Sequence, residues 1–148
     1  MIITYVQDDG STEEVSTDDL SAIEAADVEQ AMGETPWRQI EDLLRAQDPT
    51  AMRAVLWVFR RRGDKTLKFG EFDVPGWKRR LKARIERHEI DDALDSMLLE
   101  ALGAGEDSAI DAMAPHLRRL AHDPADVDAA LVALGKGHLA KAPADSTG

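Results

Sequence analysis

Apolar residues recur at helical spacing along most of this 148-residue chain, in short segments separated by residues that end or start helices. A helix-forming run over residues 25–32 stops at Gly33, which can adopt the left-handed conformation that closes a helix. Trp37, Ile40 and Leu44 then follow on one face of a second segment. The pattern predicts short helices, joined by tight turns, that pack on one another.

Three of the expected helices begin with a polar residue followed by proline: Thr-Pro at 35–36, Asp-Pro at 48–49 and Asp-Pro at 123–124. The polar side chain can accept a hydrogen bond from a free amide of the first turn, and proline loses no hydrogen bond at the first helical position. After residue 49, apolar residues form one stripe over 52–59 before Gly63 ends the helix.

The remaining signals are less uniform. Residues 2–7 alternate as in a strand, residues 8–11 form a turn, and residues 12–16 can return as the partner strand. A lone hairpin is marginal in water, so it must lean on the helices or on another copy, and the sequence leaves open whether it forms. After a break at residues 74–76, a helix-forming run extends from 77 to 102, and its apolar stripe requires either a change of face or a break near His88.

Later helices carry weaker signals. Pro115 should kink its helix or begin a second one, because it removes a hydrogen bond and clashes one turn back. Gly135 is expected to end the last helix.

These signals predict a mainly α fold, a small bundle of short capped helices to which the N-terminal β-hairpin is an optional addition. The expected regions are a hairpin over 1–16, an N-terminal helical core over 17–74, a C-terminal helical region over 75–135, and a disordered polar tail over 136–148. The start lacks a basic lead, and no run approaches the roughly 20 apolar residues of a membrane helix. We expect a soluble, unexported protein without membrane contact.

Charge is divided unevenly along the chain, whose net charge is −11. Residues 1–50 carry −11, residues 51–88 carry +8, and residues 89–148 carry −8. A basic middle between acidic ends can be neutralised within one chain or can bind head to tail between copies, so self-association is expected.

The basic segment 60–87 is the candidate partner-binding site. It can be a solvated face, a face for an acidic protein segment, or a nucleic-acid site, and the surrounding acids make nucleic acid the least favoured. Trp77 is the candidate half-exposed anchor, whereas Trp37 and Trp57 belong to apolar stripes and are expected in the core. The site residues are Arg60, Arg61, Arg62, Trp77, Lys78, Arg79, Arg80, Lys82, Arg84 and Arg87.

Residue patterns that support catalysis or metal binding are weak. The four histidines lack ligand spacing, the Asp pairs at 18–19 and 91–92 diverge rather than share a proton, and the chain has no cysteine. Its glycines form no phosphate-binding loop. We therefore expect a protein that is not an enzyme and that holds no cofactor or metal.

Roughly residues 16–73 hold an ordered series of helix signals: an acidic lead-in, Asp18-Asp19-Leu20, a glutamate-bearing helix that ends at Gly33, and Trp37 soon after. The series continues through Ala54-Val55-Leu56-Trp57-Val58, Thr66-Leu67-Lys68-Phe69 and Glu71-Phe72-Asp73. The order of these signals resembles that of the tail assembly chaperones of long-tailed (siphovirus-type) bacteriophages.

The resemblance implies a non-enzymatic role in tail assembly. Such proteins bind the tape measure protein, keep it soluble and recruit subunits of the major tail tube protein. They act in the cytoplasm of the infected bacterium and are absent from the mature virion. Two other functions remain open, a nucleic-acid-associated regulator that uses segment 60–87 and a helical adaptor protein.

Overall fold

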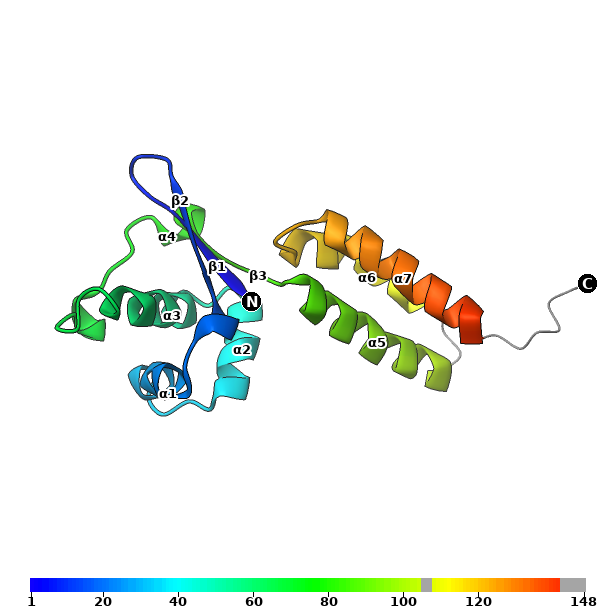
Figure 1. The fold of residues 1–148 in the computed structure, drawn as a ribbon, viewed down its shortest axis with the longest axis horizontal. Coiled ribbons are helices and arrows are strands. Elements are labelled where there is room, and N and C mark those ends of the chain that lie inside the picture. Colours follow the sequence, from blue (N-terminus) through cyan, green and yellow to red (C-terminus); the bar gives the residue numbers. More distant parts are fainter. Residues whose placement is uncertain (105–107, 142–148) are drawn as a thin grey trace, which may run out of the picture. The chain divides into compact units, whose positions relative to one another are not determined.

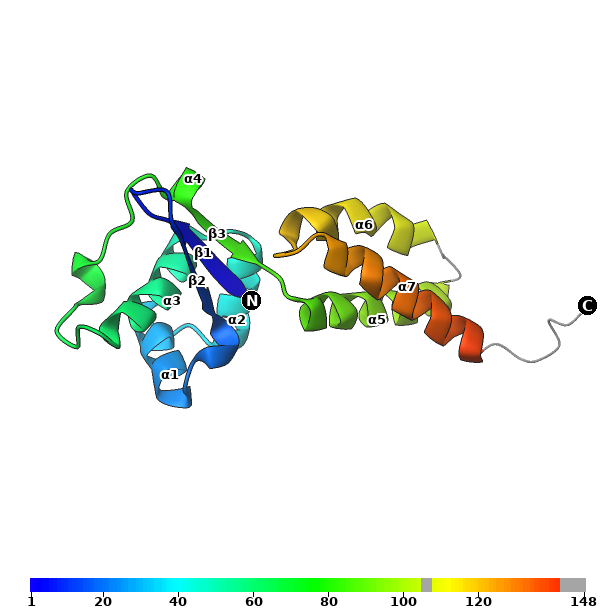
Figure 2. The ribbon, with the colours of Figure 1, turned by 45° about the horizontal axis from the view of Figure 1, so that its top comes forward.

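The computed structural model describes residues 1–104 and 108–141, and its backbone is mainly α-helical with a small three-stranded antiparallel sheet (Figures 1 and 2). The mainly α fold class predicted from the sequence is thereby confirmed. Contacts divide the chain into two compact units, Met1–Arg84 and Ile85–Gly148.

The first unit is built around its third helix. Its helices are α1 (Ala22–Ala31), α2 (Trp37–Arg45), α3 (Pro49–Arg61) and α4 (Trp77–Arg80), with 3₁₀ turns at Thr17–Asp19 and Phe69–Glu71. Residues 54–58 of α3 are all buried, because α3 packs against α1, α2 and two strands at once. Burial on every side explains why the middle of this helix is apolar without interruption.

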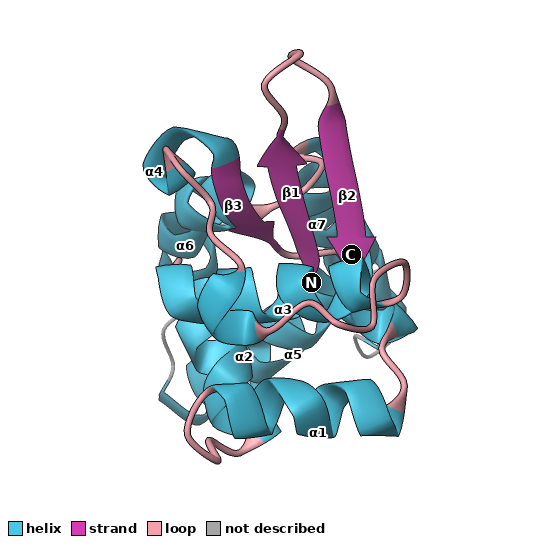
Figure 3. Cartoon of the chain, turned by 90° about the vertical axis from the view of Figure 1, so that its left-hand side faces the viewer, coloured by secondary structure: helices cyan, strands magenta, loops and turns pink. Residues whose placement is uncertain are grey.

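A three-stranded sheet completes the first unit. Its strands are β1 (Ile2–Val6), β2 (Thr12–Ser16) and β3 (Leu81–Arg84), in the order β2-β1-β3 (Figure 3). The expected hairpin is therefore present, and Ile3 of β1 pairs with Val15 on one side and Ala83 on the other. The hairpin gains the support it requires from β3 and from α3.

The helix-forming run expected over 77–102 is not helical throughout, and the alternative that it breaks near His88 is the one that agrees with the structure. One turn of helix, α4, is followed by strand β3, and the next helix begins at Arg87. Leu81 and Ile85 are four residues apart, which suits a helix, but Leu81 and Ala83 are two apart and both buried, which suits a strand. Pairing with β1 decides between the two patterns, since tertiary contacts outweigh weak local propensity.

The outer edge of β3 is covered by a side chain. Gln47, in the α2–α3 connection, donates through Nε2 to the carbonyl oxygen of Ala83 at 2.8 Å and accepts from its amide at 2.9 Å. Its primary amide thus takes the place of a fourth strand at this position. The contact holds although Gln47 has a φ of 61°, a left-handed value unusual for a residue other than glycine.

Helix starts are only partly those expected. Asp48 caps α3 by accepting from the amide of Ala51, with proline in the first turn, as predicted. Thr35 does not cap α2, because its hydroxyl donates to the carbonyl of Met32 at 2.6 Å. The Glu29 carboxylate of α1 instead accepts from the Trp37 amide at 2.9 Å, so one helix caps the next.

The second unit contains three helices, α5 (Arg87–Ala104), α6 (Ser108–Leu120) and α7 (Ala125–Lys141), each in contact with the other two. Their shared core includes Ile90, Leu94, Ala114, Leu117, Val127 and Ala130. A short parallel bridge joins Ile85 to Ala121 and ties the start of the unit to the end of α6.

Two expected boundaries in the C-terminal half are corrected. The first unit ends at Arg84 rather than at residue 74, because β3 belongs to its sheet. Pro115 lies inside helix α6, so of the two outcomes expected there, a kink or the start of a second helix, the second is wrong. Helix α7 continues through Gly135 to Lys141, because glycine weakens a helix by only about 1 kcal/mol. The rest of the predicted tail, 142–148, lies outside the described residues.

Trp57 is buried, with 7% of its surface exposed, whereas Trp37 is half-buried and donates its indole N–H to Glu41. The core position is confirmed for Trp57 alone.

Trp57→Ala should lower the free energy of unfolding by about 3–5 kcal/mol, the usual cost of truncating a buried aromatic side chain. Chemical denaturation measures it. Trp37→Ala is the control and should cost clearly less; equal losses would contradict this assignment.

Gln47→Ala should lower the free energy of unfolding by about 1–3 kcal/mol, because it leaves the amide and carbonyl of the buried residue Ala83 without their hydrogen-bond partner. Gln39→Ala, on an exposed position of α2, is the control. Denaturant titrations of both variants would decide. Equal midpoints for Gln47→Ala and the parent would mean that water replaces the side chain at no cost.

Candidate partner-binding site

A cluster of aromatic and cationic side chains attaches the segment after α3 to the surface of that helix. Arg53 donates through Nη1 to the carbonyl oxygens of Phe69 and Phe72, both at 2.8 Å, and its guanidinium lies 3.8 Å from the centre of the Phe69 ring. Trp57 meets Phe69 edge to face and donates to the carbonyl of Leu67 at 3.0 Å. Residues 53 and 57 are one turn apart, so one helix face holds the whole segment.

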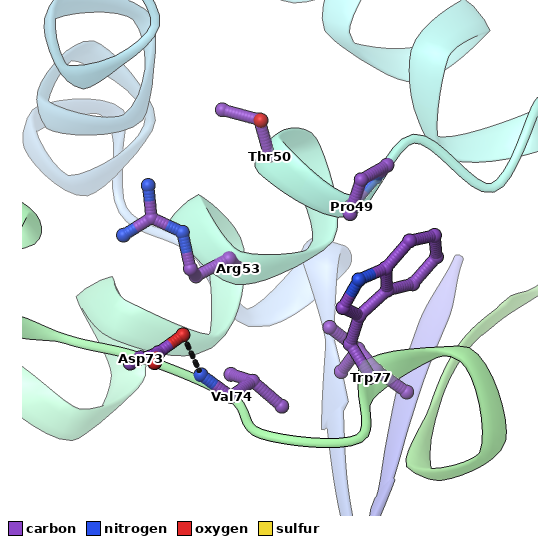
Figure 4. Close-up of a pocket in the computed structure, with 7 residues that line it drawn as sticks. Pro49, Thr50, Arg53, Asp73, Val74 and Trp77 are labelled. Atoms are coloured by element: carbon purple, nitrogen blue, oxygen red, sulfur yellow. Dashed lines mark hydrogen bonds between the residues drawn. The ribbon is translucent and has the colours of Figure 1, made fainter.

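A pocket lies beyond this cluster, where the held segment turns into α4. Side chains from the first turns of α3 and from residues 73–77 surround it (Figure 4). It is lined by Pro49, Thr50, Arg53, Asp73, Val74, Trp77 and Leu81, with a volume of about 170 Å³. Pockets that take cofactors or drug-sized ligands are larger, about 300–1,000 Å³, so this one matches a single bulky side chain.

The backbone before Trp77 sets the position of its indole. Asp73 accepts a hydrogen bond from the amide of Val74 at 2.8 Å, and Val74 is buried beneath the pocket. Gly76 then takes a φ of 69°, a left-handed conformation that favours glycine, and the chain turns directly into α4. This sharp turn brings the half-buried Trp77 back over the start of α3, beside Pro49 (Figure 4).

The predicted basic site is divided by the structure. Arg60, Arg61 and Arg62, at the end of α3, face acids of the N-terminal segment and not the pocket. Arg60 pairs with Glu13 at 2.6 Å and Arg61 with Asp27 at 3.4 Å. The charges of these three arginines are therefore neutralised by acids of the same unit.

Arg62 makes the most complete of these ion pairs. Its Nε and Nη2 both donate to the Glu24 carboxylate at 2.8 Å, and Nη2 also donates to the carbonyl of Asp19. Glu24 in turn accepts from the amide of Ser21, closing a capping box at the start of α1. These hydrogen bonds, with Arg62 the larger cause, lower the pKa of Glu24 to about 2. The spacing of Ser21 and Glu24 is a recognisable sequence signal for this cap.

The other predicted site residues are distributed between two places. Arg80 pairs with Asp8 of the hairpin turn, and hydrogen bonding to Asp8 raises the pKa of Arg80. Lys82 donates to the carbonyl of Lys78 at 2.7 Å, and Arg84 is half-buried in β3. Arg87 lies in the second unit, where it pairs with Asp91 of α5 at 3.1 Å.

Two cations remain close to the pocket. The Lys78 ammonium lies 5.9 Å from the centre of the Trp77 ring, and the neighbouring Arg79 is exposed. Within the described part of the chain, Arg79 makes no ion pair. Asp73 supplies the one carboxylate of the pocket lining, so the rim is more basic than acidic.

The site is therefore smaller than segment 60–87 and differs in composition from it. It keeps Trp77, Lys78 and Arg79 from the predicted set and adds pocket residues that the sequence did not single out, above all Pro49 and Val74. The available signal was the Asp-Val-Pro-Gly break at 73–76 just before Trp77, which marks a sharp turn.

Comparison with protein-family models, with curated proteins and with solved structures finds no match for this chain. Over the residues that the structure describes, no helix has the length and apolar character needed to cross a membrane.

The free energy of unfolding should decrease at acidic pH, because protonation of Glu24 weakens its ion pair with Arg62. Because the pKa of Glu24 is lowered to about 2 in the folded chain, against 4.5 ordinarily, its contribution is complete above about pH 4.5 and is lost as pH falls toward 2. Glu24→Gln should therefore be less stable than the parent at neutral pH, with a difference that shrinks below pH 4.5.

Denaturant titrations across a pH series measure this difference. Asp42→Asn, which removes an exposed carboxylate paired with Arg45 on α2, is the matched control and should change little. A constant gap between Glu24→Gln and the parent from pH 7 to pH 2 would contradict the assignment.

Proposed function

We propose that this protein is a tail assembly chaperone of a long-tailed bacteriophage, which binds the tape measure protein, keeps it soluble and recruits tail tube subunits. Two features support the proposal. The residues that carry the resemblance, roughly 16–73, lie in one unit around α3, and a pocket of the size of one side chain lies beside them. A chaperone of this kind would act in the cytoplasm of the infected host and leave before the virion is complete.

The Trp77 pocket is the observation that carries the mechanism. A client that is a long helix presents bulky apolar side chains at intervals along one face. A tryptophan wall with two nearby cations suits one such side chain flanked by acids, since aromatic anchors in small pockets dominate binding energy. Shallow contact at one pocket per chaperone allows release, which a transient assembly role requires.

A nucleic-acid regulator is less well supported by the same geometry. Arg60, Arg61, Arg62, Arg80 and Arg87 each hold an acidic partner in the folded chain. Phosphates would have to displace those carboxylates, and the net charge of −11 opposes approach. A helical adaptor could use the same pocket and is separated from a chaperone by the nature of its client.

Co-expression with fragments of a phage tape measure protein tests the function. The parent should raise the soluble fraction of the fragment severalfold, Trp77→Ala should abolish most of that gain, and Trp77→Phe should retain it because the aromatic wall remains. Circular dichroism checks that each variant is folded.

Two results would count against the chaperone. An unchanged soluble fraction with the parent protein would remove the tape measure protein as client. Duplex DNA binding that weakens steeply between about 50 and 200 mM salt would instead favour the regulator.

A further inference from the structure

The three tryptophans of the first unit differ in the hydrogen bonds of their indole N–H groups. Trp37 donates to the Glu41 carboxylate at 2.9 Å, and Trp57 donates to the carbonyl oxygen of Leu67 at 3.0 Å. Within the part of the chain that the structure describes, the half-buried Trp77 donates to no acceptor. Because an indole N–H that is removed from water usually has a hydrogen-bond partner, this free donor is available to a bound molecule.

The free donor lies at the pocket. In Figure 4 the nitrogen of the Trp77 indole is on the side of the ring that faces Arg53, and the six-membered ring is on the opposite side. Apolar walls come from Pro49 and from the buried side chains of Val74 and Leu81. A molecule that satisfies both features needs an apolar group for the walls and an acceptor oxygen near the indole nitrogen.

The charges around the pocket favour an anionic acceptor. Arg53 is a half-buried cation, and no carboxylate of the described residues forms an ion pair with it. Asp73, which also lines the pocket, instead accepts a hydrogen bond from the amide of Val74. Since Lys78 and Arg79 are exposed beside Trp77, three cations face one carboxylate, and a negative group is attracted.

These conditions select among the acceptors that a helical client can offer. Its backbone carbonyl oxygens are engaged inside the helix, and a side-chain amide carries no charge. A carboxylate is charged, and hydrogen bonds to a charged acceptor are roughly twice as strong as neutral ones. Glutamate suits the position best, because its longer side chain can reach alongside an apolar residue one helical turn away.

We propose that the Trp77 pocket recognises two neighbouring side chains of one acidic helix. A bulky apolar side chain fills the pocket, and a glutamate one turn away accepts a hydrogen bond from the Trp77 indole. Trp77 is then a specificity-determining donor as well as an apolar wall. This inference rests on the proposed function in taking a helix as the client, and it defines which segment of such a client the pocket selects.

Titration with synthetic peptides tests the hydrogen bond. The probe is an alanine-rich helix of roughly 18 residues with blocked ends, long enough to be helical in water. It carries one leucine, with a glutamate four positions before it and another four positions after it. Nuclear magnetic resonance resolves one indole N–H signal for each tryptophan, and Trp77→Phe identifies the signal of Trp77. That signal should move downfield on binding, while those of Trp37 and Trp57, whose donors are already bonded, are internal controls.

Affinities measure how far the carboxylate matters. Replacing both glutamates of the peptide by glutamine should weaken binding to the parent about tenfold or more at low salt, as loss of a hydrogen bond to a charged group does. Trp77→Phe keeps an aromatic wall without a donor, so its preference for the glutamate peptide over the glutamine peptide should shrink severalfold. The ratio is the readout, because a smaller wall affects both peptides equally.

A charge reversal supplies a matched pair of variants. Arg79→Glu should lower the preference for the glutamate peptide, because it replaces a cation beside the pocket by an anion. Arg38→Glu makes the same change of charge at an exposed arginine of α2 that is not part of the pocket lining, and it should keep the preference of the parent. Circular dichroism checks that every variant is folded.

Three results would overturn the inference: equal affinity of the parent for the two peptides, a full preference for glutamate in Trp77→Phe, or no binding of either peptide at millimolar concentration. Equal affinities together with a gain of soluble tape measure fragment would leave the chaperone function standing. A failed co-expression experiment together with a clear preference for glutamate would remove the tape measure protein as client and keep the recognition of an acidic helix.

Discussion

The interaction of Arg53 and Trp57 with the segment around Phe69 is the one on which the rest of the first unit depends. These α3 side chains bind the carbonyl oxygens of residues 67, 69 and 72 and enclose the Phe69 ring. With the segment fixed there, the turn at Gly76 must begin close to α3, which brings Trp77 over the pocket and delivers the following residues to the edge of β1. One cation–aromatic cluster therefore positions both the third strand and the candidate site.

Charge acts mainly inside the first unit. The arginines at the end of α3 meet acids from the hairpin and from α1, and Arg62 binds Glu24, the residue that also forms the capping box of α1 with Ser21. Exposed ion pairs contribute little stability one by one, typically under 1 kcal/mol, but they fix which surfaces face one another. Because these arginines form ion pairs within the unit, few cations are left to contact a partner. The cations beside Trp77, notably the exposed Arg79, are therefore the better candidates for such a contact.

Some helix boundaries followed from local chemistry and therefore from sequence. Asp48 and its proline start α3, and Gly33 closes the α1 turn with a φ of 69°. The cap of α2 did not follow, because it comes from Glu29 on another helix. Of the residues predicted for the candidate site, Trp77 is half-buried and lines the pocket, whereas most of the basic residues assigned with it make ion pairs elsewhere.

The sequence by itself determined the mainly α character, the burial of Trp57 and the three charge blocks, because periodicity and composition can be read from the residues themselves. It left open whether the N-terminal hairpin forms, because a lone hairpin depends on its tertiary neighbours. Only the tertiary structure decided that residues 81–84 are a strand, that Gln47 covers its edge, and that Pro49 and Trp77 share a pocket. Each of these features depends on contacts between residues tens of positions apart in the sequence. The free energy of such tertiary contacts exceeds the small differences in local helix and strand propensity.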